Sequence, residues 1–241
     1  MCIICVSKKG VRQPSLAQLR NMFQRNPDGA GYMFARNGKV TIHKGFMNWC
    51  DFNSAVESEH FTAKDPVVYH FRISTQAGVK PEMTHPFPLT KELDYCEKLD
   101  LTCRTGIAHN GIIRMTSTAK ETRFSDTALF ITDYMTRLLR NPEADMIDKP
   151  TLDMIEHLTN SKWAILSKTG DISTVGTFVN EKGLLFSNST YEPAPKVVPV
   201  KGKYTYIADK KTGKESTVKY GKYPYYNALD DYYDGEYGLI R

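Results

Sequence analysis

The 241-residue sequence lacks a long apolar run, a large excess of either charge and a regular cysteine spacing. No apolar run approaches the roughly 20 residues that a membrane-spanning helix needs, so no membrane association is expected. The 32 basic and 27 acidic residues leave a net charge of only +5, which does not argue for nucleic-acid binding. Hydrophobic residues make up 41% of the chain, which is ordinary for a globular protein.

The cysteines are few and unevenly placed, at Cys2, Cys5, Cys50, Cys96 and Cys103. An odd number at irregular spacing does not suit a disulfide framework, and the N-terminus carries no secretory pattern. We therefore expect a cytoplasmic protein with reduced thiols. No histidine pair at ligand spacing accompanies the cysteines, so no metal site and no cofactor are expected.

Apolar spacing predicts an α+β domain with helices packed on antiparallel sheets. Strands are predicted at 2–6, 65–74, 104–113, 161–176 and 183–191, with a hairpin at 30–46 that turns at Asn37-Gly38. Helices are predicted at 13–26, 48–58, 124–141 and 151–159. The third helix is the clearest, with Ser125 as its N-cap and an apolar stripe at Leu129, Ile131, Met135, Leu138 and Leu139.

The composition changes at about residue 192, which divides the chain into a domain at 1–191 and a tail at 192–241. The tail holds nine of the 14 tyrosines and eight lysines but few aliphatic side chains. Too little apolar surface remains to offset the entropy of ordering, so the tail is expected to be partly disordered. The favoured interpretation is a solvated extension. A docking segment for a partner or for single-stranded nucleic acid is the alternative, and the acidic end of the tail argues against nucleic acid.

Cys2 is an unusual residue to find beside the initiator methionine, because the run that follows reads as a buried strand. Met1 is normally removed when the second residue is small, which would leave Cys2 with a thiol and a free α-amine. That amine has a pKa near ~8 and can serve as a base at neutral pH. A nucleophile activated by its own amine is a compact catalytic unit. A small buried structural residue is the plainer interpretation.

Three further stretches carry polar residues beside predicted strands. The sequence "NPDGAGYMF" at 26–34 suits a tight turn before a strand, and "YHFRISTQAG" at 69–78 places Arg72 near the end of an apolar strand. In "AHNGII", at 108–113, the Asn110 amide and the Gly111 N–H together could stabilise an oxyanion. A turn, a structural salt bridge and an Asn-Gly hairpin would explain the three stretches equally well.

Taken together and in this order, the motifs resemble the glutamine amidotransferase domain of the N-terminal nucleophile hydrolases. The resemblance covers roughly residues 2–190 and rests on "MCIIC", "NPDGAGY", "HFRIST", "THPF", "AHNGII" and "SDTALF". It implies a four-layer αββα sandwich, with two mostly antiparallel sheets between helix layers. It also implies an enzyme that releases ammonia from glutamine.

The resemblance implies a role for each matching residue. Cys2 would be the nucleophile with its α-amine as the base. Asn110 and the N–H of Gly111 would form the oxyanion hole. Arg72 would pair with the α-carboxylate of glutamine, and Asp126 with its α-ammonium group.

The remaining matches imply supporting roles. Thr75 and Gln76 would line the glutamine pocket. His85 and His109 would hold their loops, and Asp28–Gly29 would shape a turn close to the site.

The sequence also departs from the family pattern. Ile73 stands where an aromatic residue is usual, and Gln76-Ala77-Gly78 replaces the usual His-Gly or Gly pair. These changes leave open a different small amide or a γ-glutamyl compound as substrate. A third hypothesis is a non-catalytic binding protein that works through its tail. Any ammonia acceptor would be a separate protein.

Overall fold

The computed structural model describes residues 2–74, 78–114, 123–138 and 147–193, and the backbone of three later strands at 197–200, 203–207 and 215–217. The chain divides into two compact units, Met1–Pro193 and Ala194–Arg241. In the second unit the described strands form one antiparallel sheet of β12 (Val197–Val200), β13 (Lys203–Ile207) and β14 (Glu215–Thr217). Of the predicted tail, residues 192–193 and these three strands are described, and the rest lies outside the described residues.

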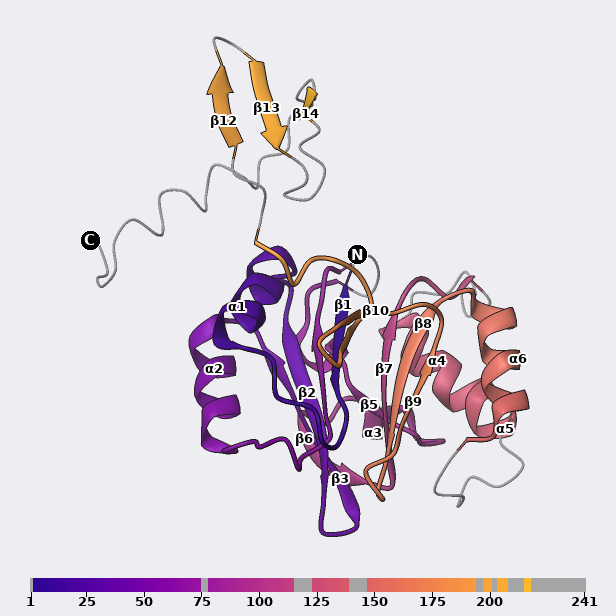
Figure 1. The fold of residues 1–241 in the computed structure, drawn as a ribbon. Coiled ribbons are helices and arrows are strands. Elements are labelled where there is room, and N and C mark those ends of the chain that lie inside the picture. Colours follow the sequence, from indigo (N-terminus) through magenta and orange to yellow (C-terminus); the bar gives the residue numbers. More distant parts are fainter. Residues whose placement is uncertain are drawn as a thin grey trace. The chain divides into compact units, whose positions relative to one another are not determined.

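Two antiparallel sheets lie side by side at the centre of the first unit (Figure 1). The first sheet has the order β10-β11-β1-β4-β2-β3-β6, and the second has the order β5-β7-β8-β9. The strands of the first sheet are β1 (Ile3–Ser7), β2 (Ala30–Arg36), β3 (Lys39–Phe46), β4 (Val67–Phe71), β6 (Asp100–Cys103), β10 (Val179–Glu181) and β11 (Leu184–Phe186). Those of the second are β5 (Phe87–Pro88), β7 (Thr105–Asn110), β8 (Lys162–Ser167) and β9 (Ile172–Val175).

Helices cover the outer faces of both sheets. Figure 1 shows α1 and α2 beside the first sheet and α4, α5 and α6 beside the second. The helical segments of this unit are α1 (Leu16–Arg25), α2 (Trp49–Ser58), η1 (Pro81–Met83), α3 (Leu93–Cys96), α4 (Asp126–Phe130), η3 (Ile131–Met135), α5 (Thr136–Leu138) and α6 (Lys149–Thr159). Four of them begin at a side chain that accepts a bond from a free N–H of the first turn: Ser15, Asn48, Ser125 and Asp148.

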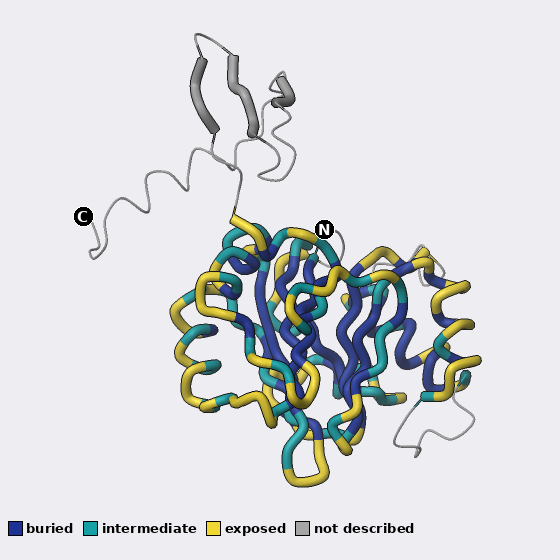
Figure 2. Tube along the Cα trace, viewed as in Figure 1, coloured by how far each residue is buried: buried dark blue, intermediate teal, exposed yellow. Residues whose placement is uncertain are grey.

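The alternation of side chains along the strands produces three apolar layers. Ile3 and Cys5 of β1 face the cluster beneath α1 and α2, whereas Ile4 and Val6 face the cluster between the sheets. On β8, Trp163 and Ile165 face α4 and α6, whereas Ala164 and Leu166 face the first sheet. Figure 2 shows the buried residues concentrated in these central strands. Three apolar layers separate four structural layers, which confirms the predicted αββα sandwich.

The predicted helix at 124–141 is only partly right. Its described residues begin at Asp126 and change after Phe130 into a π-helical segment, η3. Phe130, the last residue of α4, is buried in the core, whereas Leu129 is half-buried. Ile131 and Met135 are buried as predicted, and Leu139 lies outside the described residues.

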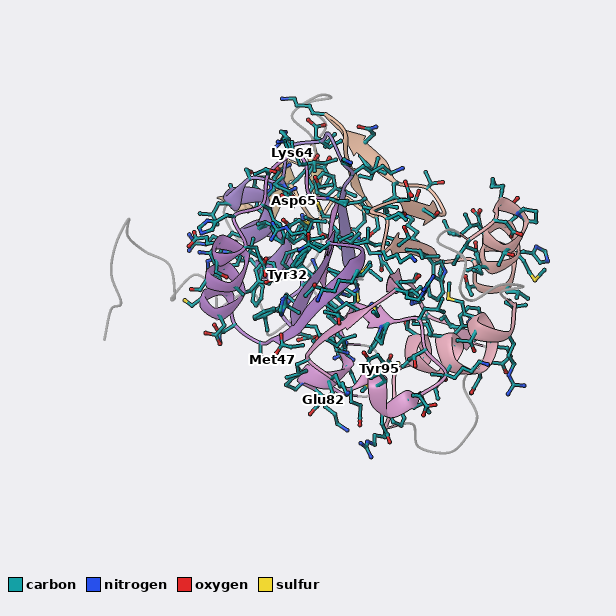
Figure 3. All side chains as sticks on the ribbon, turned by 90° about the horizontal axis from the view of Figure 1, so that it is seen from below. Tyr32, Met47, Lys64, Asp65, Glu82 and Tyr95 are labelled. Atoms are coloured by element: carbon teal, nitrogen blue, oxygen red, sulfur yellow. The ribbon has the colours of Figure 1, made fainter. Side chains whose placement is uncertain are left out.

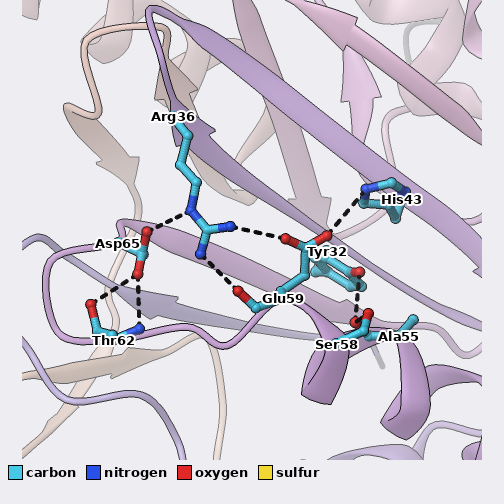
Figure 4. Close-up of polar contacts among 8 residues, drawn as sticks. All are labelled: Tyr32, Arg36, His43, Ala55, Ser58, Glu59, Thr62 and Asp65. Atoms are coloured by element: carbon cyan, nitrogen blue, oxygen red, sulfur yellow. Dashed lines mark hydrogen bonds and ion pairs between the residues drawn. The ribbon is translucent and has the colours of Figure 1, made fainter.

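The first sheet carries a cluster of charged groups where β2 ends, close to α2. Figure 3 shows Tyr32 among the side chains that fill this region, and its hydroxyl donates to Ala55 O at 3.3 Å. Arg36 Nε donates to Asp65 Oδ1 at 2.7 Å, and its Nη1 donates to Glu59 Oε2 at 3.0 Å (Figure 4). The pKa of Asp65 is lowered, mainly by the bond from Arg36. This network ties β2 to the segments on either side of Phe61 and lies away from the candidate site residues.

Candidate active site

Five strand ends meet at one end of the sandwich, and the antiparallel pairing determines which they are. Ile3 at the start of β1 pairs with Phe71 at the end of β4, and Phe71 also pairs with Ala30 at the start of β2. The end of β11 lies on the other side of β1, because Cys5 pairs with Phe186. The end of β7 joins from the second sheet through Asn110. The residues just outside these five ends therefore lie close together.

Cys2 lies at this end, half-buried, immediately before β1. Its Sγ accepts the N–H of Ile73 at 3.3 Å and donates to Ile73 O at 3.4 Å. Burial raises the pKa of the thiol, while the Ile73 N–H and the positive charge of Arg72 lower it to a smaller extent. The sulfur is thus held as a neutral thiol, and a base is needed for it to act as a nucleophile.

Arg72 follows β4 and is only 5% exposed. Its N–H donates to Gly29 O at 2.8 Å, its carbonyl accepts the Asp28 N–H at 3.0 Å, and its Nη1 donates to Gly78 O at 2.9 Å. Burial lowers its pKa, and the thiolate form of Cys2 and the carboxylates of Asp28 and Asp126 act in the opposite direction. The site therefore contains a fixed positive charge close to the thiol and to two carboxylates.

The turn before β2 holds the loop that follows Arg72. Asp28 Oδ2 accepts the N–H of Ser74 at 2.8 Å. Gly29 has a φ of 118°, and a Cβ there would lie 2.5 Å from Thr84 Cγ2. The predicted role of Asp28–Gly29 in turn geometry fits this arrangement. Thr75 and Gln76 lie outside the described residues.

Asn110 ends β7 and is 7% exposed, whereas Gly111 is exposed. The Asn110 Nδ2 donates to Ser187 Oγ at 2.9 Å, which uses one of the two N–H groups of the amide. A Cβ on Gly111 would lie 2.3 Å from Ser161 Oγ, so only glycine fits this position. The exposed backbone of Gly111 therefore lies directly beside the buried amide donor of Asn110.

Asp126 is the first residue of α4, and its carboxylate binds two backbone N–H groups. Oδ2 accepts from Ile113 at 2.7 Å, and Oδ1 accepts from Thr127 at 2.8 Å. Burial raises the pKa of the carboxyl, and these bonds and the charge of Arg72 lower it. Asp126 therefore fixes the loop after Gly111 and places a carboxylate on the same side as Arg72.

Three buried histidines lie behind the site, and roles were predicted only for His85 and His109. His109 points to the α4 side of the second sheet, where its ring centroid lies 4.2 Å from that of Trp163. Because a carbonyl only accepts, His70 Nε2 must donate to His109 O at 3.0 Å, and it lies 3.0 Å from His85 Nδ1. His109 Nδ1 lies 2.8 Å from Thr127 Oγ1, which donates to Asp126 Oδ1 at 3.3 Å. The histidines thus connect β4 and β7 to the Asp126 loop.

The histidine cluster should make the fold sensitive to acid. Burial lowers the pKa of His70 and His109 to about 3, and among the described residues His70 Nδ1 and His109 Nε2 have no hydrogen-bond partner. An unfolded histidine protonates near 6.5, so the unfolded state binds more protons between these values. The free energy of unfolding should therefore fall as the pH drops below 6.5, by about 1.4 kcal/mol per pH unit for each such histidine.

In the His70→Gln variant, the slope of the unfolding free energy against pH should fall by the equivalent of about one proton. Glutamine keeps an N–H donor but does not titrate. Urea unfolding at pH 7, 6 and 5 measures the slope. His157→Gln, at an exposed position on α6, is the matched control and should behave as the wild type. An unchanged slope in His70→Gln would rule out a neutral His70 as the source of acid sensitivity.

Ser187 and Asn188 follow β11, and no sequence motif predicted a role for them. Ser187 Oγ accepts the Asn110 amide, and Asn188 Nδ2 donates to Cys2 O at 2.7 Å. The available signal was a polar "SNST" run directly after the apolar "GLLF", which marks a strand end. Within the described ranges, no group of three or more His, Cys, Asp and Glu forms a metal site, and no helix is long and apolar enough to cross a membrane.

Comparison with known proteins gives matches among solved structures alone, since no family model and no curated protein matches the chain. One similar structure is a glutamine phosphoribosylpyrophosphate amidotransferase from B. subtilis, at 15% identity and a TM-score of 0.44. Another is described as an allosteric regulatory enzyme of purine biosynthesis, at 14% identity and a TM-score of 0.46. Each match covers 91% of this chain, which spans about half (49%) of the matched chain. The case for function therefore rests on the residues of this chain.

Proposed function

We propose that this chain is a glutamine amidotransferase-type amidohydrolase, in which Cys2 attacks the side-chain amide of glutamine. The products are glutamate and ammonia, formed through a glutamyl-thioester. The observation that carries the proposal is the convergence at one end of the sandwich of a half-buried thiol, a buried guanidinium, a carboxylate and a buried amide. These groups come from Cys2, Arg72, Asp126 and Asn110, which are widely separated in the sequence.

Arg72 and Asp126 suit the charged end of a free amino acid. Glutamine is a zwitterion with a neutral carboxamide at the reacting end. A guanidinium can bind the α-carboxylate, and the free lone pairs of a carboxylate can bind the α-ammonium group. Held by both charges, the substrate would present its carboxamide to the thiol without losing further rotational freedom during reaction.

Cys2 would then carry out the covalent chemistry in a chain processed to begin at this residue. The α-amine takes the thiol proton as sulfur bonds to the amide carbon, and the oxygen becomes an oxyanion facing the Asn110 amide and the Gly111 N–H. Collapse of the tetrahedral intermediate breaks the C–N bond, and the α-ammonium group of Cys2 returns the proton to the departing ammonia. Water, deprotonated by the same amine, then attacks the thioester, and the sulfur leaves as the thiol by taking that proton back from the amine.

The wild-type chain itself provides the test. Incubation with glutamine should release glutamate and ammonia in equal amounts, and intact mass should show a chain that lacks Met1. Asparagine, a γ-glutamyl peptide and a simple acyl amide form the comparison panel. Hydrolysis of another amide in place of glutamine would contradict the proposed substrate, and hydrolysis of none would contradict the proposed activity.

A further inference from the structure

Ser187 joins the two sheets at the candidate site. Its side chain is fully buried, and its Oγ accepts two hydrogen bonds, from Ile4 N–H and from Asn110 Nδ2, both at 2.9 Å. Its own N–H donates to Ile4 O at 2.9 Å. One hydroxyl therefore fixes the second residue of β1 and the amide of Asn110 to the same point.

Asn188 holds the nucleophile from the same segment. Its Nδ2 donates to Cys2 O at 2.7 Å, and its Oδ1 accepts from Thr190 N–H at 3.0 Å and from Thr190 Oγ1 at 2.8 Å. These two acceptor contacts set the orientation of the amide, so that its N–H group points at Cys2. Lys162 Nζ also donates to Ser187 O, which anchors the peptide to β8.

We propose that the pair Ser187–Asn188 is a positioning element that sets the spacing between the Cys2 nucleophile and the Asn110 oxyanion donor. This inference rests on the proposed function. The bond to Ser187 uses one amide N–H of Asn110 and thereby determines where the second one points. An oxyanion donor acts on charge that exists only in the transition state, so its orientation affects kcat more than KM.

The first test is Ser187→Ala with glutamine as substrate. The kcat should fall by roughly 10- to 10²-fold with KM within about twofold, because a misdirected donor fails at the transition state. Ser7→Ala is the matched control, since Ser7 is also fully buried and bonds to Val11 O and Arg12 O at the opposite end of β1. Ser7→Ala should keep the wild-type kcat even if both variants lose thermal stability.

A double-mutant cycle with Asn110→Ala separates positioning from general destabilisation. Ser187→Ala should lower kcat much less in that background, because the amide that it orients is gone and only its bond to Ile4 N–H is lost. Asn188→Ala acts on Cys2 and should lower kcat by a similar factor in both backgrounds. If Ser187→Ala does not fold, Ser187→Cys keeps most of the volume with a weaker acceptor and should show an intermediate kcat.

The outcomes separate the two proposals. Three results would each overturn the positioning role while the wild type still hydrolyses glutamine. They are an equal kcat for Ser187→Ala and Ser7→Ala, additive effects of Ser187→Ala and Asn110→Ala, and a wild-type kcat in a folded Ser187→Cys. A wild-type chain that hydrolyses no amide would instead remove the proposed function, and this inference with it.

Discussion

Replacing Cys2 with alanine is expected to lower glutamine hydrolysis by more than about 10⁴-fold, because the covalent route needs the sulfur and oxyanion stabilisation alone gives little turnover. The fold should persist, since the side chain is half-buried and its sulfur contacts only the backbone of Ile73 among the bonds described. Unfolding free energy should change by about 1 kcal/mol or less. Ammonia release and thermal unfolding measure the two effects.

Cys50→Ala is the control for this prediction, because Cys50 is exposed on α2. It should keep the wild-type rate. In the Cys50→Ala variant, which lacks the exposed thiol, iodoacetamide should inactivate the enzyme in step with a mass increase at Cys2, and glutamate should slow that reaction by occupying the site. Cys2→Ala with the wild-type rate would assign the activity to another residue or to a contaminant.

The layered fold was predictable because it follows from local patterns. The apolar run after Cys2 had to be a buried strand, and the Asn37-Gly38 turn determined a hairpin. The assignment of Ile3 to one apolar layer and Ile4 to another required the neighbouring sheets, which the sequence does not specify. Alternation on a strand shows that two faces differ but not what covers each.

The candidate site was likewise predictable only in part. Arg72, Asn110 and Asp126 could be predicted as site residues because each stands in a short motif that resembles a family pattern. Ser187 was missed, since its bonds to Ile4 and Asn110 join segments far apart in the sequence. A serine after a strand is a common residue, and its role depends on which strand ends meet it.

The sequence pattern also did not predict the π-helical segment after Phe130. An apolar stripe at 3.6-residue spacing predicts a continuous helix, and Ile131 and Met135 fit both forms. Directly before this segment, Phe130 packs against Trp163, with ring centroids 5.4 Å apart. That contact depends on β8, so helix periodicity alone could not predict it.

Replacing Asn110 with aspartate should lower kcat for glutamine by about 10²- to 10³-fold or more with little change in KM, because a carboxylate cannot donate to an oxyanion and repels its charge. The two side chains have nearly the same shape. Ser187 Oγ already accepts from Ile4 N–H, so its own hydrogen can be donated to the new carboxylate and the link between the sheets can persist. The loss would therefore report on the donor and not on the fold.

Asn180→Asp is the matched control for that change. Asn180 is exposed, and its Oδ1 accepts the Gly183 N–H at 2.9 Å, a bond that aspartate can also accept. The control should leave kcat, KM and the unfolding temperature near their wild-type values. If Asn110→Asp kept the wild-type kcat, the oxyanion would have to be stabilised without the Asn110 amide, and the Gly111 N–H would be the remaining donor of the proposed pair. A selective loss of kcat in a folded Asn110→Asp protein requires that the buried amide at the end of β7 acts on the reacting oxygen.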